Sequence, residues 1–172
     1  MDQSTARSAR QWALKALGRR MHTAHEIRTG LSRRGYDNAT IACTLEDLTR
    51  LGYINDLEFA RAWVTSRSAH QMHGRLRLLR DLRQKGIPDE MVESVMSELL
   101  TQSDEVRIAV KAAEKKRRLM KESGKTSGRL TGGTRTAARE RESLYRHLRS
   151  RGFTNQVINL ALDCFSFEED AT

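Results

Sequence analysis

One short pattern recurs three times along this chain of 172 residues and constrains its fold more than any other feature. Each copy contains a leucine, basic residues, a glycine, an apolar residue and then apolar residues at helical spacing, and the copies start at Leu31, Leu82 and Leu148. The first two copies are offset by 51 residues, and the match continues upstream to pair Trp12 with Trp63. The sequence therefore predicts a repeat unit of about fifty residues.

The third copy contains additional residues. The offset from Leu82 to Leu148 is 66 residues, which exceeds the first offset by 15. An insertion around residues 123–133, with the sequence SGKTSGRLTGG, explains the excess. Its serine, glycine and lysine content is typical of a flexible loop.

The glycine of each copy has a mechanical explanation. A helix that ends in a Schellman motif places a left-handed glycine just after the helix, followed by an apolar residue that contacts the last turn. The chain has three such pairs in the repeated pattern and one more between them: Gly35 with Tyr36, Gly86 with Ile87, Gly152 with Phe153, and Gly52 with Tyr53. We therefore expect four helices to end in the same way.

New helices are expected directly after three of these turns. Asp37 and Thr154 can cap them, and Pro88 at the corresponding position lacks an N–H that would have no partner there. Upstream, Thr23 and Glu26 have the spacing of a capping box. The apolar residues after the turns recur at helical spacing, as Ile41, Leu45 and Leu48, as Val92, Met96 and Leu99, and as Ile158, Leu162 and Phe165.

A first helix precedes these two in each unit. We expect it at residues 7–20, at residues 56–70 with Asn55 or Asp56 as its cap, and at residues 104–121 with Ser103 as its cap. A single proline and few aromatic residues also favour helix throughout.

The fold class predicted is thus all-α, with three tandem three-helix repeats stacked into an elongated, curved array. Units of about fifty residues bury little surface alone, so neighbours are expected to stack. The repeats are placed at residues 1–51, at residues 52–101, and at residues 102–172 with the flexible insertion 123–133.

The charge of the chain points to an anionic partner. It has 31 lysine and arginine residues against 22 acidic residues, for a formal charge of +9. Such a balance favours nucleic acid or an acidic protein surface as the partner, although the same charge can serve solubility alone.

Other classes find no support in the sequence. No apolar run is long enough to span a membrane, and the N-terminus lacks the apolar core of a signal peptide, so we expect a cytoplasmic protein without membrane contact. Cys43 and Cys164 lack metal-binding spacing and are interpreted as reduced thiols. The sequence motifs of common enzymes do not occur, and the histidine pairs His22/His25 and His70/His73 lack a surrounding set of metal ligands. We therefore expect no catalysis, no cofactor and no metal site.

The middle of the chain resembles a known family. The matching residues keep an ordered spacing across two helices and the turn between them: Gly52-Tyr53-Ile54-Asn55-Asp56, Phe59, Ala60, Trp63 and Arg67, then Gly74, Leu78, Leu82 and Lys85-Gly86-Ile87. This pattern is similar to that of the RecX family, bacterial modulators of the RecA recombinase. The flanking repeats resemble the family's layout more loosely, and the insertion 123–133 departs from it.

The resemblance implies a non-enzymatic protein that binds RecA nucleoprotein filaments in recombination, DNA repair and the SOS response. Family members limit filament extension and suppress strand exchange and the ATPase and coprotease activities of RecA. Many also bind single- or double-stranded DNA without sequence preference. We therefore expect the RecA filament and DNA as partners, and a monomeric protein.

Basic residues are the candidate contacts for such partners, because they can serve a filament interface or bind the phosphates of DNA. The candidates are Arg61, Arg67, Arg75, Arg77, Arg80, Arg83 and Lys85 in the middle repeat, Arg33 and Arg34 in the first, and Lys115, Lys116 and Arg118 in the third. In the middle repeat Leu78, Leu79 and Leu82 define the buried stripe, which turns Arg77 and Arg80 outward. A solvated helix face is the competing interpretation of each single residue.

An alternative function is that of a DNA-binding protein that acts independently of RecA, either sequence-tolerant or through helix-turn-helix units. Against the second form, the helix after each glycine turn carries more acidic than basic residues in the first two repeats. Trp12 and Trp63 occupy equivalent positions, which favours a packing role over base stacking.

Overall fold

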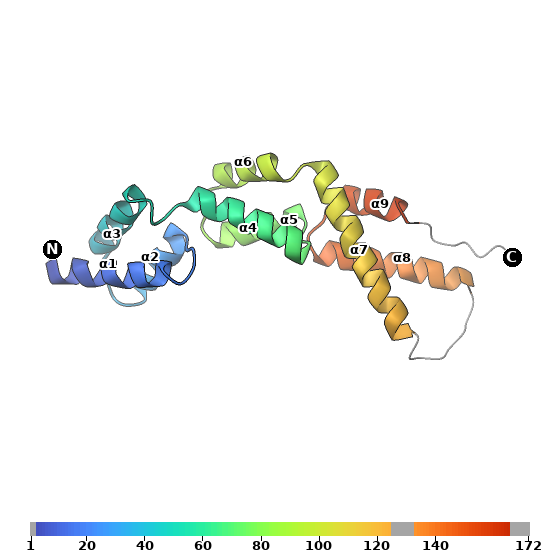
Figure 1. Ribbon diagram of the computed structural model, residues 1–172, viewed down its shortest axis with the longest axis horizontal. Helices are drawn as coiled ribbons and strands as arrows, with labels where there is room; N and C mark the ends of the chain where they lie inside the picture. The colour runs from blue at the N-terminus through green and yellow to red at the C-terminus, as the bar shows by residue number, and fades with distance from the viewer. Residues whose placement is uncertain (1–2, 125–132, 166–172) are drawn as a thin grey trace. The chain divides into compact units, whose positions relative to one another are not determined.

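The computed structural model describes residues 3–124 and 133–165 (Figure 1). Over these two ranges the chain forms nine α-helices and no strand. They are α1 (Gln3–Leu17), α2 (Ala24–Ser32), α3 (Asn38–Arg50), α4 (Asp56–Gln71), α5 (Arg75–Gln84), α6 (Asp89–Leu99), α7 (Gln102–Gly124), α8 (Gly133–Ser150) and α9 (Asn155–Asp163). The all-α prediction is confirmed, and the helices follow one another in the order expected of three tandem three-helix repeats. The repeat boundaries and the curved array stay predictions.

Contacts between Cα atoms divide the chain into two compact units. The first combines Met1–Trp63 with Arg80–Val95, and the second combines Val64–Leu79 with Met96–Thr172. Helices α4, α5 and α6 each contribute residues to both units.

The predicted glycine turns are confirmed. Gly35, Gly52, Gly86 and Gly152 have φ angles of 83°, 75°, 75° and 85°, which glycine adopts without steric cost. The backbone N–H that follows each glycine donates to the carbonyl of the expected leucine, as from Ile87 to Leu82 at 3.2 Å and from Tyr53 to Leu48 at 2.9 Å. Four helices therefore end in Schellman motifs.

Most of the predicted helix starts are also confirmed. Asp37 accepts a hydrogen bond from the Thr40 N–H, and Thr154 accepts one from Val157. Of the two cap candidates for α4, Asn55 is the one that accepts from the first turn of that helix, from the Glu58 N–H at 3.0 Å.

The predicted cap of α7 is wrong. Ser103 lies inside the helix, and Thr101 caps it by accepting a hydrogen bond from the Asp104 N–H at 3.2 Å. The Asp104 carboxylate in turn accepts from the Thr101 N–H at 3.3 Å and from its hydroxyl at 2.6 Å. This reciprocal capping box gives partners to the backbone N–H groups of both Thr101 and Asp104, whereas a Ser103 cap would satisfy fewer N–H groups. The helix therefore begins earlier than predicted. The first helix also begins earlier, at Gln3, and ends at Leu17, where the poor helix former Gly18 follows.

Each unit has its own apolar core. In the first unit, α1, α2 and α3 bury a cluster that includes Ile27, Leu31, Ile41, Leu45 and Leu48. In the second unit, α7, α8 and α9 bury a cluster that includes Ala109, Leu144, Phe153, Ile158 and Leu162. The apolar faces predicted for α3 and α9 thus form these cores, with Phe165 packed at the edge of the second.

Two further predictions fall partly outside the described residues. The insertion 123–133 overlaps the end of α7 and the start of α8, and residues 125–132 between them are not described. A search of the described helices finds none that is long and apolar enough to cross a membrane.

Candidate interaction surface

The basic face predicted for α5 is exposed. Leu78 and Leu82 are fully buried, whereas Arg77, Arg80 and Arg83 are exposed. The helix therefore separates an apolar stripe from a row of arginines three residues apart. Leu79, predicted as part of the buried stripe, is only partly buried.

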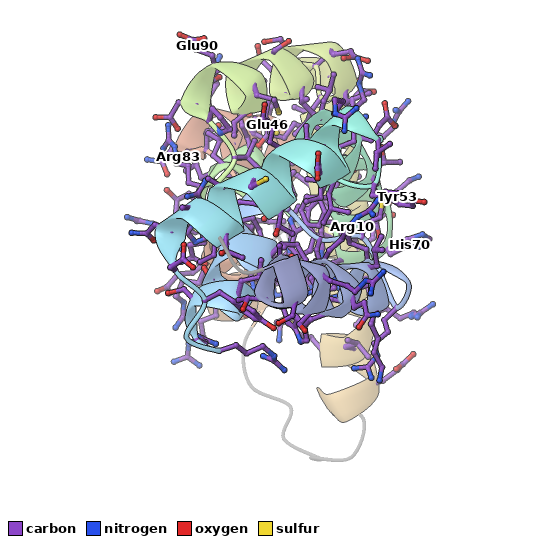
Figure 2. All side chains as sticks on the ribbon, turned by 90° about the vertical axis from the view of Figure 1, so that its left-hand side faces the viewer. Arg10, Glu46, Tyr53, His70, Arg83 and Glu90 are labelled. Carbon is purple, nitrogen blue, oxygen red and sulfur yellow. The ribbon has the colours of Figure 1, made fainter. Side chains whose placement is uncertain are left out.

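Several candidate arginines form ion pairs at the surface. The Arg83 Nε lies 2.7 Å from the Asp89 Oδ1, and Arg61 pairs with Glu58 at 3.2 Å. Figure 2 shows Arg83 at the surface, as it does Tyr53, which is 56% exposed. Exposed pairs of this kind contribute about 0–1 kcal/mol to stability, so an anionic partner can displace them at low cost.

Two other candidates of the middle helices have local partners. The Arg67 guanidinium donates to the Gln71 side chain, one turn further along α4. The backbone N–H of Arg75 donates to the Glu105 Oε1 at 2.9 Å, at the start of α5. Burial raises the pKa of Glu105, and this hydrogen bond opposes the rise.

The candidates on α7 differ in exposure. Lys115 and Arg118 are exposed, and Arg118 lies 3.8 Å from Glu122 one turn later. Lys116 is partly buried near His147. Burial lowers the pKa of His147, and the positive charges of Arg151 and Lys116 lower it further.

Arg34 and Lys85 lie on tryptophan rings. The Arg34 Cζ is 4.4 Å from the centre of the Trp12 ring, and the Lys85 Nζ is 5.2 Å from the centre of the Trp63 ring. Such cation–π contacts hold a long basic side chain against the protein. Arg33, beside Arg34, is exposed. Trp12 and Trp63 are partly buried. The Trp63 ring also stacks on the Phe59 ring, with 5.6 Å between the ring centres. The predicted packing role of the tryptophans thus includes cation binding.

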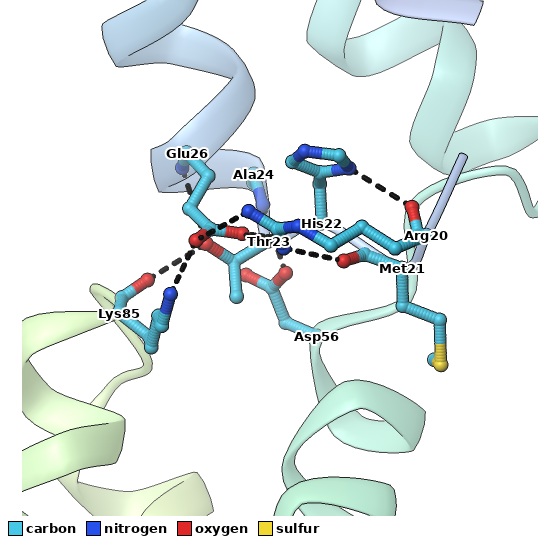
Figure 3. Close-up of polar contacts among 8 residues, drawn as sticks. All are labelled: Arg20, Met21, His22, Thr23, Ala24, Glu26, Asp56 and Lys85. Carbon is cyan, nitrogen blue, oxygen red and sulfur yellow. Dashed lines mark hydrogen bonds and ion pairs between the residues drawn. The ribbon is translucent and has the colours of Figure 1, made fainter. Parts of the chain in front are cut away.

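Lys85 has a second partner that sequence reasoning missed. Its Nζ lies 2.5 Å from the Glu26 Oε1, and the Glu26 Oε2 accepts from the Arg20 Nη1 at 3.0 Å (Figure 3). Burial alone would raise the pKa of Glu26, but the hydrogen bonds and charges of Arg20 and Lys85 lower it to about 2. The carboxylate is thus held in its ionised form between two cations.

The surroundings of this ion pair form a junction between the start of α2 and the end of α5. The Thr23 hydroxyl donates to the Lys85 carbonyl at 2.7 Å while it accepts from the Glu26 N–H, and the Ala24 N–H donates to the Asp56 Oδ1 at 2.9 Å (Figure 3). Gly86 lies so close to His25 that a Cβ atom on the glycine would be 2.3 Å from the His25 Cβ. The predicted capping box of Thr23 and Glu26 therefore does more than start a helix.

The second unit contains a junction of the same construction, between the start of α5 and the end of α8. The Gly74 N–H donates to the Arg151 carbonyl and the Leu76 N–H donates to the Gly152 carbonyl, both at 2.9 Å. A Cβ atom on Gly152 would be 2.5 Å from the Arg77 Cβ.

The two junctions share some equivalent positions but not all, because the glycine turn meets His25 in one and Arg77, the equivalent of Glu26, in the other. Thr23 and Gly74 are 51 residues apart, and so are Ala24 and Arg75. The N–H groups of Ala24 and Arg75 each donate to a carboxylate near the start of a later helix. The acceptor is Asp56 for Ala24 and Glu105 for Arg75. The only sequence signal that relates the two junctions is the alignment of repeats, which pairs Thr23 with Gly74. It did not reveal that both positions contact the glycine turn of the following three helices.

A basic cavity of about 540 Å³ lies on the first unit near Arg34. It is lined by Trp12, Lys15, Ala16, Arg19, Arg20, His22 and Arg34. The His22 Nδ1 lies 2.9 Å from the Arg20 carbonyl, which orients the imidazole ring. No carboxylate contributes to this lining, so the cavity suits an anionic group.

The described residues contain no group of three or more histidine, cysteine, aspartate or glutamate side chains arranged to hold a metal ion. Both cysteines are exposed and free, in agreement with the interpretation as thiols.

Comparison with known proteins identifies the same family over most of the chain. The model of the first three-helix domain of RecX matches residues 9–48, and the model of the second matches residues 55–96. A regulatory protein RecX of Prosthecochloris aestuarii is 36% identical over 163 residues, which cover 95% of this chain and 97% of that protein. One of Pelodictyon phaeoclathratiforme is 33% identical and covers 94% of this chain and 91% of that protein.

A solved structure has the same fold. The crystal structure of RecX from Lactobacillus salivarius superposes with a TM-score of 0.77, at 21% sequence identity, over 93% of this chain and 96% of that one.

Proposed function

Because the chain belongs to the RecX family of regulatory proteins, we propose that it binds RecA nucleoprotein filaments and inhibits or modulates their recombinase, ATPase and coprotease activities. The observation that carries this proposal is the match to a regulatory protein RecX along nearly the whole length of both chains. A relationship of that extent favours a shared mode of action over a shared fold alone.

The exposed arginines of α5 support the proposal as the contact surface. Arg77 and Arg80 form no ion pair among the described residues, and both project from the helix side opposite the buried leucines. Guanidinium groups without an ion pair need not break one when they meet carboxylates or phosphates, and they bind both in bidentate geometry. We therefore place Arg77 and Arg80 at the centre of the candidate set and Arg83 at its edge.

The mechanism follows from differential affinity. A protein that binds one state of a filament more tightly than another shifts the population toward that state by mass action. Binding across a filament would oppose the conformational cycle that ATP hydrolysis drives, and the effect requires no catalysis by the bound protein.

The test uses purified RecA, single-stranded DNA and this chain. We expect substoichiometric amounts of the chain to slow DNA-dependent ATP hydrolysis, and the double variant Arg77→Gln, Arg80→Gln to need a higher concentration for the same effect. The matched control is the double variant Arg10→Gln, Arg28→Gln, which removes the same charge from exposed arginines of α1 and α2 outside the candidate set (Figure 2 labels Arg10). Unchanged hydrolysis at every ratio of chain to RecA would refute the proposal, and equal loss in both variants would refute the assignment of the surface.

A further inference from the structure

The first three helices and the middle three share a feature at the end of their second helix. The residue before the Schellman glycine is a cation in both, Arg34 in the first and Lys85 in the second. Arg34 lies on the ring of Trp12, and Lys85 lies on the ring of Trp63. The two cations are 51 positions apart in the sequence, and so are the two tryptophans. The two tryptophan–cation pairs are thus equivalent by sequence and by geometry.

In the middle helices this surface is occupied. The start of α2 covers it, with the Glu26 carboxylate on Lys85, the Thr23 hydroxyl on the Lys85 carbonyl and His25 against Gly86. These contacts combine an ion pair, a hydrogen bond and close packing at one helix start.

In the first three helices the equivalent surface is open. A Cβ atom added to Gly35 would meet no atom within 4 Å, whereas one added to Gly86 would overlap His25. Arg34 forms no ion pair with any described residue, and no described group donates to its carbonyl oxygen.

The basic cavity lies at this open surface. Arg34 and Trp12 line it, and Lys15 and Arg19 add positive charge without an ion pair to any described residue. Arg20, which also lines it, is already bound to Glu26. The open surface therefore keeps at least three uncompensated cations beside an aromatic ring.

We propose that this surface, formed by Trp12, Arg34, Gly35 and the cavity residues Lys15 and Arg19, is a socket for the acidic start of a helix in a partner protein. The occupant is a helix that begins with a Thr-x-x-Glu capping box, as α2 does, and its glutamate takes the place at Arg34 that Glu26 takes at Lys85. Its cap hydroxyl donates to the Arg34 carbonyl.

The carbonyl oxygen and the glycine favour a protein helix over nucleic acid as the occupant. The ionised phosphodiester backbone can neutralise the cations, but it has no hydrogen atom to donate to the Arg34 carbonyl. The open space beside Gly35 is at the position equivalent to Gly86, which packs against the start of a helix elsewhere in the same molecule. This inference goes beyond the proposed action on RecA, since it concerns a separate surface and is tested without RecA.

The test is binding of a synthetic peptide to the full chain. A labelled helical peptide that begins Thr-Ala-Glu-Glu is titrated with the protein, and its fluorescence anisotropy is recorded. The matched peptide begins Thr-Ala-Gln-Gln and differs only in charge. We expect the acidic peptide to bind in the micromolar to millimolar range, roughly 10 µM to 1 mM, and the neutral peptide to bind at least about tenfold more weakly.

Protein variants locate the site. Arg34→Gln is expected to weaken the acidic peptide about tenfold, and Lys15→Gln is a second variant that keeps the tryptophan–cation contact intact. The control is Arg28→Gln, an exposed arginine of α2 that does not line the cavity and is expected to leave the affinity unchanged. Circular dichroism confirms that each variant is folded.

Three results of the peptide titrations would overturn the inference. They are the absence of acidic-peptide binding up to about 1 mM, equal affinity for the two peptides, and equal effects of Arg34→Gln and Arg28→Gln. A parallel titration with a labelled oligothymidylate tests whether nucleic acid, rather than an acidic helix, is the anionic partner of this surface. If Arg34→Gln weakens only the oligonucleotide, the socket belongs to nucleic acid and the proposal fails.

Discussion

Glu26 has three partners that come from different parts of the first unit. It completes the capping box of α2 with Thr23, and its carboxylate binds Arg20 and Lys85. The side chain is 16% exposed, so these charges interact with little screening by water. Removal of the carboxylate would leave Lys85 partly buried without its anion.

We predict that Glu26→Gln lowers the free energy of unfolding at neutral pH by about 2 kcal/mol, because a pKa near 2 in the folded state corresponds to an ionised form that is strongly favoured by folding. The pKa is lowered on folding, so the stabilisation is complete above pH 4.5 and is lost as the pH falls from 4.5 toward 2. Urea unfolding followed by circular dichroism at several pH values measures both effects.

The control for this prediction is Glu46→Gln. Glu46 lies exposed on α3 and forms no ion pair with a described residue (Figure 2). The wild type and the control should lose stability together below pH 4.5, and Glu26→Gln should lose less over that range. Parallel pH curves for all three proteins would show that Glu26 is not stabilised in the folded state.

At the scale of elements, the Schellman glycines have two separate roles. All four have positive φ, which an L-residue adopts only with strain, but only some of them also receive another helix. Gly35 has free space where a side chain would project, and Gly86 has His25. A comparison of Gly35 with Gly86 therefore distinguishes the cost of backbone strain from the cost of lost packing.

We predict that Gly35→Ala destabilises the protein by about 1 kcal/mol, the cost of positive φ for alanine. Gly86→Ala should cost at least about 1 kcal/mol more, because its methyl group would lie 2.3 Å from the His25 Cβ and displace the start of α2. Thermal and urea unfolding of the two variants provide the comparison. Equal losses would mean that the junction yields to the methyl group without cost.

A second prediction at this scale concerns the start of α7. Thr101→Ala should lower the free energy of unfolding by about 1 kcal/mol, because the Asp104 N–H loses its side-chain acceptor. Ser103→Ala should change it by a few tenths of that or less, since Ser103 is exposed inside the helix and alanine is the better helix former. The same unfolding experiments measure both, and a larger loss for Ser103→Ala would restore it as the cap.

Local chemistry explains which elements were predictable. The glycine turns and the caps Asp37 and Thr154 depend on residues within one turn of each other, so the sequence alone identifies them. The cap of α7 was missed because both Thr101 and Ser103 can cap, and only the pairing of Thr101 with Asp104 decides between them.

The junctions could not be predicted, because they depend on contacts between distant segments. Glu26 and Lys85 are 59 positions apart, and nothing near either residue marks the other as its partner. Lys85 was predicted as a partner contact, which stays a prediction, and its position on Trp63 and Glu26 was not foreseen. The exposure of Arg77 and Arg80, by contrast, follows from the helical period of the neighbouring leucines and was predicted correctly.

At the scale of the whole molecule, the formal charge of +9 favours binding to polyanions whatever their sequence. The two DNA-related functions differ in how this charge acts. A protein that neutralises phosphates without reading bases loses affinity steeply with salt, whereas a helix-turn-helix reader keeps a preference for one sequence at moderate salt. Exposed acidic residues on α6, among them Glu90 and Glu93, oppose the entry of that helix into a groove.

We therefore predict that the chain binds single-stranded oligonucleotides of different sequence with similar affinity, and that the logarithm of the binding constant falls linearly with the logarithm of the salt concentration. The double variant Arg77→Gln, Arg80→Gln should reduce that slope by about one to two, the change expected when two phosphate contacts are lost, since each contact contributes about 0.7 on single strands. The control Arg10→Gln, Arg28→Gln removes the same net charge from exposed positions outside the candidate set and should change the slope less. Fluorescence anisotropy over a series of salt concentrations gives each slope.

Equal changes of slope in the two double variants would mean that net charge alone drives binding. A strong preference for one duplex sequence at moderate salt would instead support the helix-turn-helix function, because base contacts, unlike phosphate contacts, distinguish sequences.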